Sequence, residues 1–322
     1  MLRVLCIAGN TRAMLTQYDS TSPLKIGTRG SPLALAQAVE TRDRLMAAHD
    51  MPEAAFAIEV IQTTGDAVQD RPLSEIGGKG LFTKEIELAL MDRRIDIAVH
   101  SMKDVATRLP DGLVISTVLP REDVRDTFIS REFSTLDDLP HGAVFGSSSL
   151  RRRAQLLARR PDLKMVEFRG NVQTRLMKLD EGVAVATLLA QAGLRRLGNS
   201  DLGTVLETDV LLPAVAQGAI GIEQRAEDES VAALLTPLND PSTAHCVQAE
   251  RAFLAALDGS CRTPIAGLAK LTGDRIEFTG EILRPDGSEV LRTSRSGPVS
   301  DRARLGRDAG EELKSRSGGT FF

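Results

Sequence analysis

Apolar and polar residues follow two periods in turn along the first 120 residues. Short apolar or alternating runs are typical of strands, and apolar residues three or four positions apart are typical of helices. Polar turns separate these segments, and the first turn holds Ser31 and Pro32, a pair that suits a helix start. The predicted strands are 24–28, 56–60 and 95–99, and the predicted helices begin at residues 32 and 81.

The plan of strand, polar turn and helix returns after residue 120, without a repeated sequence. Alternation of this kind favours an α/β architecture with largely parallel strand pairing. Beyond residue 214 the pattern changes to one helix, a turn and a run of strands, which indicates a small α+β domain. The predicted strands are 127–130, 143–145, 164–168, 265–271, 275–282 and 289–293, and the predicted helices follow residues 149 and 171 and cover 242–257.

Composition narrows the classes of function. Hydrophobic residues make up 42% of 322, which excludes a disordered chain and suits two or three domains. Aromatic residues make up 3%, with no Trp, which argues against stacking on single-stranded nucleic acid. A net charge of −4 gives no general attraction for nucleic acid or membranes, and no apolar run of about 18 residues is present. We therefore expect neither kind of partner.

The cysteines and the first residues bear on the compartment. Cys6, Cys246 and Cys261 are too few and too widely spaced for a disulfide framework or a zinc site. Residues 1–22 form a loose extension, in which no small-residue cleavage site follows the first apolar stretch convincingly. We expect a cytoplasmic protein that binds no metal.

Positive charge is concentrated in one region of this acidic chain. Residues 151–200 hold 11 Lys and Arg against 4 Asp and Glu, a surplus of 11 − 4 = +7. Arg151, Arg152 and Arg153 follow a serine turn at a predicted helix start, where cations oppose the helix dipole. A ligand with several acidic groups would explain this placement, and Arg169 with Arg175 would face the same crevice. A basic helix face that is merely solvated remains the alternative.

Two side chains are candidates for chemistry, and each also has a plainer interpretation. Asp104 follows Lys103 at the end of an apolar strand, where a carboxylate could act as a general acid or base, or could form a surface ion pair. Cys261 lies in a Gly-Ser-Cys-Arg turn that favours a reactive thiolate, although an ordinary loop cysteine would look the same. By contrast, Cys246 lies within a predicted helix and is expected to be buried.

Other polar groups are expected to serve structure. His100 and His245 have no partners at metal-ligand spacing, so we expect satisfied structural roles for both. Residues 77–80, Gly-Gly-Lys-Gly, lack the spacing of a phosphate-binding loop, and we interpret them as a mobile loop.

Six separated motifs occur in an order that resembles the porphobilinogen deaminases, also called hydroxymethylbilane synthases. The resemblance covers residues 24 to about 270 and weakens beyond them. The motifs are GTRGSPLA at 27–34, GGKGLF at 77–82, HSMKD at 100–104, SSLRR at 148–152, RGNV with TRL at 169–176, and GSC at 259–261.

The resemblance implies a specific activity and a covalent cofactor. Such enzymes carry a dipyrromethane on the cysteine that matches Cys261, add four porphobilinogen units with loss of ammonia, and release hydroxymethylbilane. The aspartate that matches Asp104 is the catalytic group. Cofactor contacts are implied for Ser101, Lys103, Asp104, Ser147, Ser149, Arg151, Arg152 and Gly193, and substrate contacts for Arg29, Ser31, Phe82, Arg169, Arg175 and Arg196.

The resemblance also implies an architecture. Two lobes resemble periplasmic binding proteins, a third domain carries the cysteine, and the protein is expected to be a monomer. The domains are then 23–119 with 218–238, 120–217 and 239–322, after the extension 1–22. Each pyrrole brings two carboxylates, so the basic region suits a growing polyanion, and one carboxylate could stabilise the cation left by ammonia loss.

Three residues depart from the family pattern. Ser147 replaces a threonine, Val185 an aspartate and Ala216 a glycine, and the last change matters only if the backbone there needs a positive φ. A non-enzymatic, two-lobed anion-binding protein is the rival interpretation, because it would explain the arginines, although it would not need Asp104 or Cys261. An acyl-transfer enzyme with Cys261 as nucleophile would need a paired histidine base, and none is evident.

Overall fold

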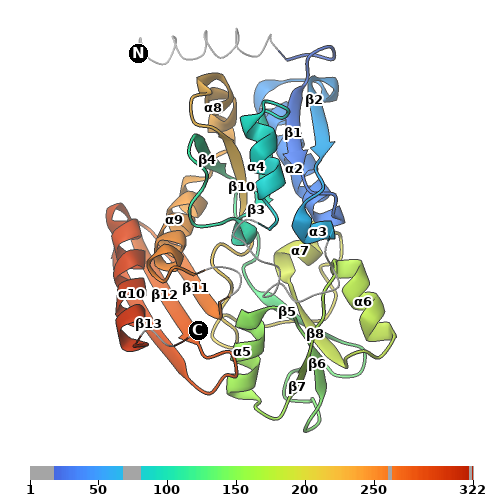
Figure 1. The fold of residues 1–322 in the computed structure, drawn as a ribbon, viewed down its shortest axis with the longest axis vertical. Helices are drawn as coiled ribbons and strands as arrows, with labels where there is room; N and C mark the ends of the chain where they lie inside the picture. Colours follow the sequence, from blue (N-terminus) through green and yellow to red (C-terminus); the bar gives the residue numbers. More distant parts are fainter. Residues whose placement is uncertain (1–17, 68–80, 260–262, 319–320, 322) are drawn as a thin grey trace.

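A computed structural model describes residues 18–67, 81–259, 263–318 and 321 of the chain. Two α/β lobes lie one above the other, and a smaller domain of helices and strands lies beside them (Figure 1). The predicted fold class, two lobes followed by a small α+β domain, is confirmed.

The first lobe is built on a sheet of order β2-β1-β3-β10-β4. Alternate residues of β3 face opposite layers, because Ile97 and Val99 pack with α2 and α8 whereas Ala98 packs with α4. The sheet is therefore covered on both faces. The strands are β1 (Leu24–Thr28), β2 (Phe56–Val60), β3 (Ile97–Ser101), β4 (Leu113–Val118) and β10 (Ile220–Arg225). The helices are α2 (Pro32–His49), α3 (Thr64–Ala67), α4 (Lys84–Met91) and α8 (Glu229–Leu235), with 3₁₀ turns at Glu53–Ala55, Met102–Asp104 and Thr236–Leu238.

The second lobe repeats this plan with a sheet of order β7-β6-β8-β5-β9. Leu156 of α5 packs on one face, and Leu179 of α6 with Leu194 of α7 packs on the other. The strands are β5 (Asp126–Ser130), β6 (Val144–Gly146), β7 (Lys164–Val166), β8 (Ala186–Ala190) and β9 (Thr204–Val205). The helices are α5 (Leu150–Arg159), α6 (Val172–Asp180) and α7 (Gln191–Arg196).

Strand pairing differs from the prediction of largely parallel sheets. In the first sheet β10 runs antiparallel to both β3 and β4, and in the second β5 runs antiparallel to both β8 and β9. Both strands border a segment in which the chain passes from one lobe to the other, 119–125 before β5 and 206–219 before β10. Each sheet thus includes one antiparallel strand that directly follows a crossover. The local pattern of apolar residues could not reveal the direction of that strand.

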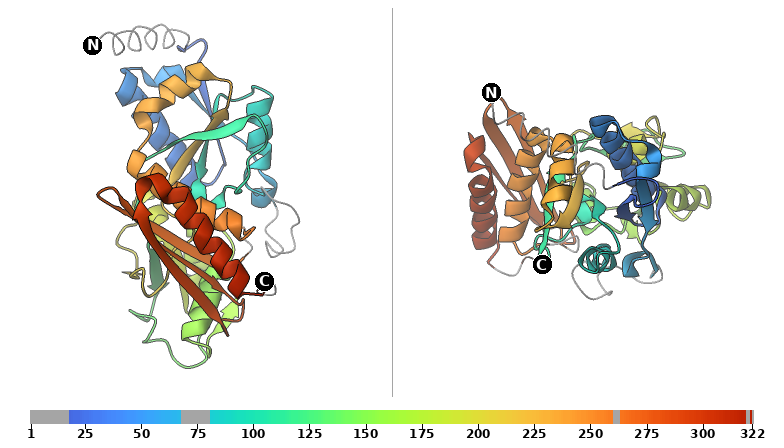
Figure 2. Two further views of the ribbon diagram at one scale, coloured as in Figure 1. Left: turned by 90° about the vertical axis from the view of Figure 1, so that its left-hand side faces the viewer. Right: turned by 90° about the horizontal axis from the view of Figure 1, so that it is seen from above.

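The third domain is an antiparallel sheet of order β11-β12-β13 with two helices on one face (Figure 2). Phe253 of α9 packs on Phe278 of β12 with ring centroids 5.0 Å apart, and Leu313 of α10 is in the same core. The three strands and the first helix were predicted, whereas α10 was not. The elements are α9 (Pro241–Ala256), β11 (Ile265–Thr272), β12 (Arg275–Leu283), β13 (Val290–Pro298), a 3₁₀ turn (Val299–Asp301) and α10 (Arg302–Arg316).

A buried carboxylate joins the third domain to both crossovers. Glu250 of α9 is fully buried and accepts hydrogen bonds from Arg121 Nη1 at 2.6 Å and Nη2 at 3.0 Å. The same carboxylate accepts from the backbone N–H groups of Ala216, at 2.6 Å, and Ala269, at 2.8 Å. A charge buried this deeply is tolerated because four donors surround it.

Ala216 has a φ of +59°, so the departure from the family glycine does have a structural consequence. An alanine in this left-handed conformation costs about 1 kcal/mol relative to glycine. Its N–H group is held by Glu250, and its side chain is buried in the core of the third domain. The crossover therefore keeps the unfavourable conformation because its surroundings fix it.

The turn between β12 and β13 contacts α5 of the second lobe closely. Gly287 has a φ of +75°, and a methyl group there would overlap the backbone of Leu157 and Ala158. Gly273, in the turn between β11 and β12, has a φ of +63° but open space around it.

Gly287→Ala should therefore destabilise the protein far more than Gly273→Ala. The second change adds only the backbone cost of about 1 kcal/mol, whereas the first must also displace the hairpin from α5 and should cost more than about 2 kcal/mol. Urea unfolding of both variants measures the difference. Equal losses of stability would show that the contact with α5 does not hold the third domain.

Candidate active site between the lobes

Asp104 lies at the end of a 3₁₀ turn that directly follows β3. Met102, the first residue of the turn, and Val105, which follows it, are buried in the core of the third domain. Arg251 of α9 donates to the carbonyl oxygens of Val105, at 3.2 Å, and Ala106, at 2.6 Å. The turn is thus held by the first sheet and by the third domain together, and sequence reasoning gave Arg251 no role.

Arg29 follows β1 and reaches the same place. Its Nη1 lies 3.8 Å from Oδ2 of Asp104, and its guanidinium carbon lies 4.2 Å from the ring centre of Phe82. The side chains of Arg29 and Asp104 are 22% and 30% exposed, so a ligand can reach both. Arg29, Phe82 and Asp104 therefore lie together in space, and their contact with a ligand stays a prediction.

Arg151 and Arg152 share a buried partner that the sequence did not indicate. Their Nη2 atoms lie 2.7 and 2.6 Å from the two oxygens of Asp126, at the start of β5. Their Nη1 atoms donate to the carbonyl oxygens of Leu212, at 2.7 Å, and Leu188, at 2.8 Å. Both arginines are at most 5% exposed. Helix α5 tolerates these buried cations at its first turn because the carboxylate of Asp126 faces them.

Two cations and one carboxylate leave this buried group positive. Burial raises the pKa of Asp126, but Arg151 and Arg152 outweigh it and hold that pKa well below its usual range. The Nε atoms of both arginines are buried and have no hydrogen-bond partner among the described residues. An unsatisfied buried N–H group is costly, so each is a candidate to donate to a bound carboxylate. These donors fit an anionic cofactor.

Further cations from both lobes lie within electrostatic range of Asp104. Burial lowers the pKa of Lys103 to about 8, Asp104 opposes this shift and Arg152 adds to it. Burial lowers the pKa of Arg175 to about 10. The charges of Arg152 and Arg169 add to this shift, and the charge of Asp104 opposes it. The six basic residues just described stand against two carboxylates, Asp104 and Asp126, a formal surplus of 6 − 2 = +4.

The predicted site serines shape the turns around this cluster. Ser31 caps α2 by accepting from the N–H group of Ala34, and Ser149 caps α5 by accepting from that of Arg152. Ser147 accepts from the N–H group of Ser149 at 3.3 Å, and Ser101 bonds to Gln37 at 2.9 Å. Contact of these hydroxyls with a ligand stays a prediction.

Gly193 and Arg196 lie on α7, where the two lobes touch. A methyl group on Gly193 would come within 3.3 Å of Leu33 on α2. Arg196 bonds to Glu40 of α2 and to the carbonyl oxygen of Gly218. Both residues therefore border the contact between the lobes, and their role in binding stays a prediction.

The predicted cofactor cysteine, Cys261, and the glycine-rich segment 77–80 lie outside the described residues. Cys246 is buried as predicted, and burial raises the pKa of its thiol to about 11. His100 is also structural as predicted, because its Nε2 lies 2.9 Å from Glu223 and both side chains are buried. Among described residues, no group of His, Cys, Asp and Glu is placed to hold a metal ion, and no helix could span a bilayer.

Comparison with known proteins relates the chain to one enzyme family. Residues 24–233 match the model of "Porphobilinogen deaminase, dipyromethane cofactor binding domain" and residues 244–315 that of "Porphobilinogen deaminase, C-terminal domain". The chain is 65% identical over 310 residues to a porphobilinogen deaminase of Paracoccus denitrificans, which covers 96% of this chain and 99% of the relative. The chain belongs to the porphobilinogen deaminase family.

A second porphobilinogen deaminase, from Nitrobacter winogradskyi, is 58% identical over 298 residues, 92% of this chain and 94% of the relative. Solved structures of other proteins are more distant. The periplasmic VFT2 domain of Bordetella pertussis BvgS covers 70% of this chain and 89% of its own at 14% identity, with a TM-score of 0.39. A periplasmic substrate-binding protein of an ABC transporter from Coxiella burnetii covers 69% and 94% at 14% identity, with a TM-score of 0.41.

Asp126→Asn should destabilise the protein by about 3–5 kcal/mol at pH 7, because Arg151 and Arg152 would stay buried without a counter-charge. Asp180→Asn is the matched control, since Asp180 pairs with Arg131 at the surface of the same lobe and its loss should cost less than about 1 kcal/mol. Urea unfolding measures both.

The pH dependence of stability gives a second readout for Asp126. Its pKa is lower in the folded protein than in the unfolded chain, so its stabilisation is present above about pH 4 and is lost as the pH falls below that value. Wild-type protein should therefore lose stability between pH 4 and pH 2 more steeply than Asp126→Asn. Parallel curves would contradict the role given to this carboxylate.

Proposed function

We propose that this chain is a transferase of tetrapyrrole biosynthesis that joins four porphobilinogen units head to tail, with loss of ammonia, to give hydroxymethylbilane. The observation that carries the proposal is one reachable carboxylate, Asp104, among a surplus of cations supplied by both lobes. Porphobilinogen carries an acetate and a propionate, so a lengthening chain of such units needs several cations around a single reacting point.

Dipyrromethane is the proposed cofactor, joined through a thioether to Cys261, and when bound it supplies the free pyrrole carbon to which the first unit is joined. Arg151 and Arg152 would hold its carboxylates through their unsatisfied Nε–H groups. Lys103 would hold another carboxylate, and a nearby anion would raise the pKa of Lys103 above about 8 and keep it charged. Ser101, Ser147, Ser149 and Gly193 complete the proposed cofactor site.

Asp104 is the proposed catalytic residue. The protonated amino group of porphobilinogen leaves as ammonia when its bond to the methylene carbon breaks, and a cation at that carbon, conjugated to the pyrrole, remains. The carboxylate of Asp104 would stabilise this cation and accept a hydrogen bond from the pyrrole N–H. The cation then bonds to the free pyrrole carbon of the chain, which loses its proton. Arg29 Nη1 lies 3.8 Å from Oδ2 of Asp104, so a substrate carboxylate held by this arginine would lie next to the reacting carboxylate.

The substrate side chains are assigned to arginines around Asp104. Arg29 and Arg175 lie within electrostatic range of that carboxylate, and Arg169 lies within range of Arg175. Phe82 would keep the guanidinium of Arg29 in place by stacking against it. The proposed substrate contacts are Arg29, Ser31, Phe82, Arg169, Arg175 and Arg196.

The remaining features of the proposal follow the family. The proposed domains are 23–119 with 218–238, 120–217 and 239–322, after an extension over 1–22. We propose that the protein is a cytoplasmic monomer that needs no metal, nucleic acid or membrane. The small sheet domain would carry the cofactor on Cys261, and Arg251 of α9 in the same domain binds the Asp104 turn.

Intact mass tests the covalent cofactor. Wild-type protein should be heavier than its sequence by one dipyrromethane, and Cys261→Ser should have the mass of its sequence alone. An unmodified and inactive wild-type chain would instead favour a non-enzymatic anion-binding protein of the same fold.

Turnover tests Asp104 in the same preparation. Asp104→Asn keeps the shape of the side chain but removes its charge, so it should fold, bind porphobilinogen and lose turnover by a factor of about 10² or more. Asp111→Asn, an exposed aspartate in the following loop, is the control and should keep full turnover. Near-normal turnover in Asp104→Asn would contradict the proposed role.

A further inference from the structure

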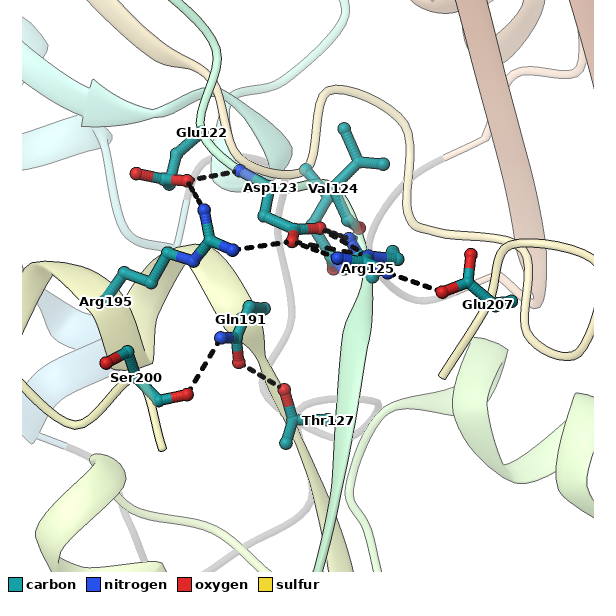
Figure 3. A network of polar contacts seen from close by, with 10 residues as sticks. Glu122, Asp123, Val124, Arg125, Thr127, Gln191, Arg195, Ser200 and Glu207 are labelled. Atoms are coloured by element: carbon teal, nitrogen blue, oxygen red, sulfur yellow. Dashed lines mark hydrogen bonds and ion pairs between the residues drawn. The ribbon is translucent and has the colours of Figure 1, made fainter. Parts of the chain in front are cut away.

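Two adjacent arginines of α7 carry contacts of the second lobe with its neighbours. Arg195 bonds to Glu122, at 2.9 Å, and lies 3.2 Å from Asp123, both in the first crossover (Figure 3). Arg196 instead reaches the first lobe, where its Nε donates to Oε2 of Glu40 on α2 at 3.1 Å. Helix α7 thus binds one crossover with one arginine and the opposite lobe with the next.

Further polar contacts hold the Glu40–Arg196 pair, which is partly exposed. The other oxygen of Glu40 accepts from Nε of Arg44 at 3.2 Å and from its Nη2 at 3.0 Å. Nη2 of Arg196 also donates to the carbonyl oxygen of Gly218 in the second crossover, at 3.2 Å. The side chain of Arg196 is 9% exposed and that of Glu40 is 27% exposed. The pair therefore gains more from its charge than a fully exposed pair would.

The pair is also accessible. Glu40, Arg44 and Arg196 border a shallow cavity of about 590 Å³ that is open to solvent along α2. A carboxylate that arrives through this space would meet the guanidinium of Arg196 already bound to a carboxylate of the protein. Replacing one carboxylate by another avoids leaving a largely buried arginine unpaired, which would be costly. An incoming carboxylate can therefore replace Glu40 at Arg196, whereas loss of Glu40 without a replacement would be unfavourable.

We propose that Glu40 is a positioning residue that occupies Arg196 until a carboxylate of the lengthening pyrrole chain displaces it. This inference rests on the proposed function, because it needs a product that gains two carboxylates at each step. Displacement frees Glu40 from α7 and breaks this bond between the lobes, so the lobes can separate as the chain grows. Arg196 thus binds product carboxylates only at a late step, and this binding is coupled to separation of the lobes.

Steady-state kinetics of Glu40→Gln test the competition directly. The amide keeps the size of the side chain but removes its charge, so Arg196 should accept substrate carboxylates more readily. We expect KM for porphobilinogen to fall about threefold to tenfold, with kcat unchanged or lower. Asp43→Asn borders the same cavity, changes the net charge equally and has no bond to Arg196, so KM should stay within about twofold.

The Arg196→Gln background completes the kinetic test. In that background, adding Glu40→Gln should change KM no further. An unchanged or raised KM in Glu40→Gln alone would overturn the proposal, because a residue with a purely structural role would not lower KM when it is replaced.

Hydrogen exchange across residues 191–197 gives a readout that does not depend on rate. Exchange should quicken in wild-type protein as mass spectrometry shows units adding to the chain, and should already be fast in unloaded Glu40→Gln. If protein loaded with added pyrrole units showed no change in hydrogen exchange, the displacement of Glu40 from Arg196 would be overturned. The proposed function would remain intact. Absence of any loaded form in wild-type protein would contradict the proposed function itself.

Discussion

The buried carboxylate of Asp126 is the constraint on which the rest of the site depends. It fixes Arg151 and Arg152 at the start of α5, although helix geometry disfavours cations there. It also accepts a hydrogen bond from Nε2 of Gln217 at 3.0 Å, and the carbonyl oxygen of Gln217 accepts from Nε of Arg121 at 2.9 Å. Because Arg121 binds Glu250 in turn, two buried carboxylates, one in the second lobe and one in the third domain, are joined through the crossovers.

This chain of contacts explains how three separate units can form one site. The third domain holds the Asp104 turn through Arg251 and contacts α5 through Gly287. The first lobe meets the second at α7, where Glu40 and Arg196 form an ion pair that solvent can reach. Contacts near the buried carboxylates are thus enclosed and costly to break, whereas the contact between α2 and α7 is the one that we propose opens. In this proposal the reacting centre stays fixed while the width of the site changes.

The sequence predicted the elements better than their pairing. Ser31 and Ser149 marked helix starts through local chemistry, and both cap helices as expected. The antiparallel strands β5 and β10 could not be predicted, because their partners belong to distant parts of the chain. For the same reason the arginine pair was identified but Asp126, 25 residues before Arg151, was not. The positive φ of Ala216 depends on the packing around Glu250, which no local pattern encodes.

We propose that arginines and one lysine from both lobes recognise the side-chain acids of pyrroles beside a single reacting carboxylate. The most direct test of this proposal is the affinity of cofactor-loaded Asp104→Asn for porphobilinogen and for its dimethyl ester, measured by calorimetry. The ester should bind about 10² times more weakly or worse, since hydrogen bonds to charged groups contribute about 1.5–3 kcal/mol each. Equal affinity for the acid and the ester would contradict the proposal.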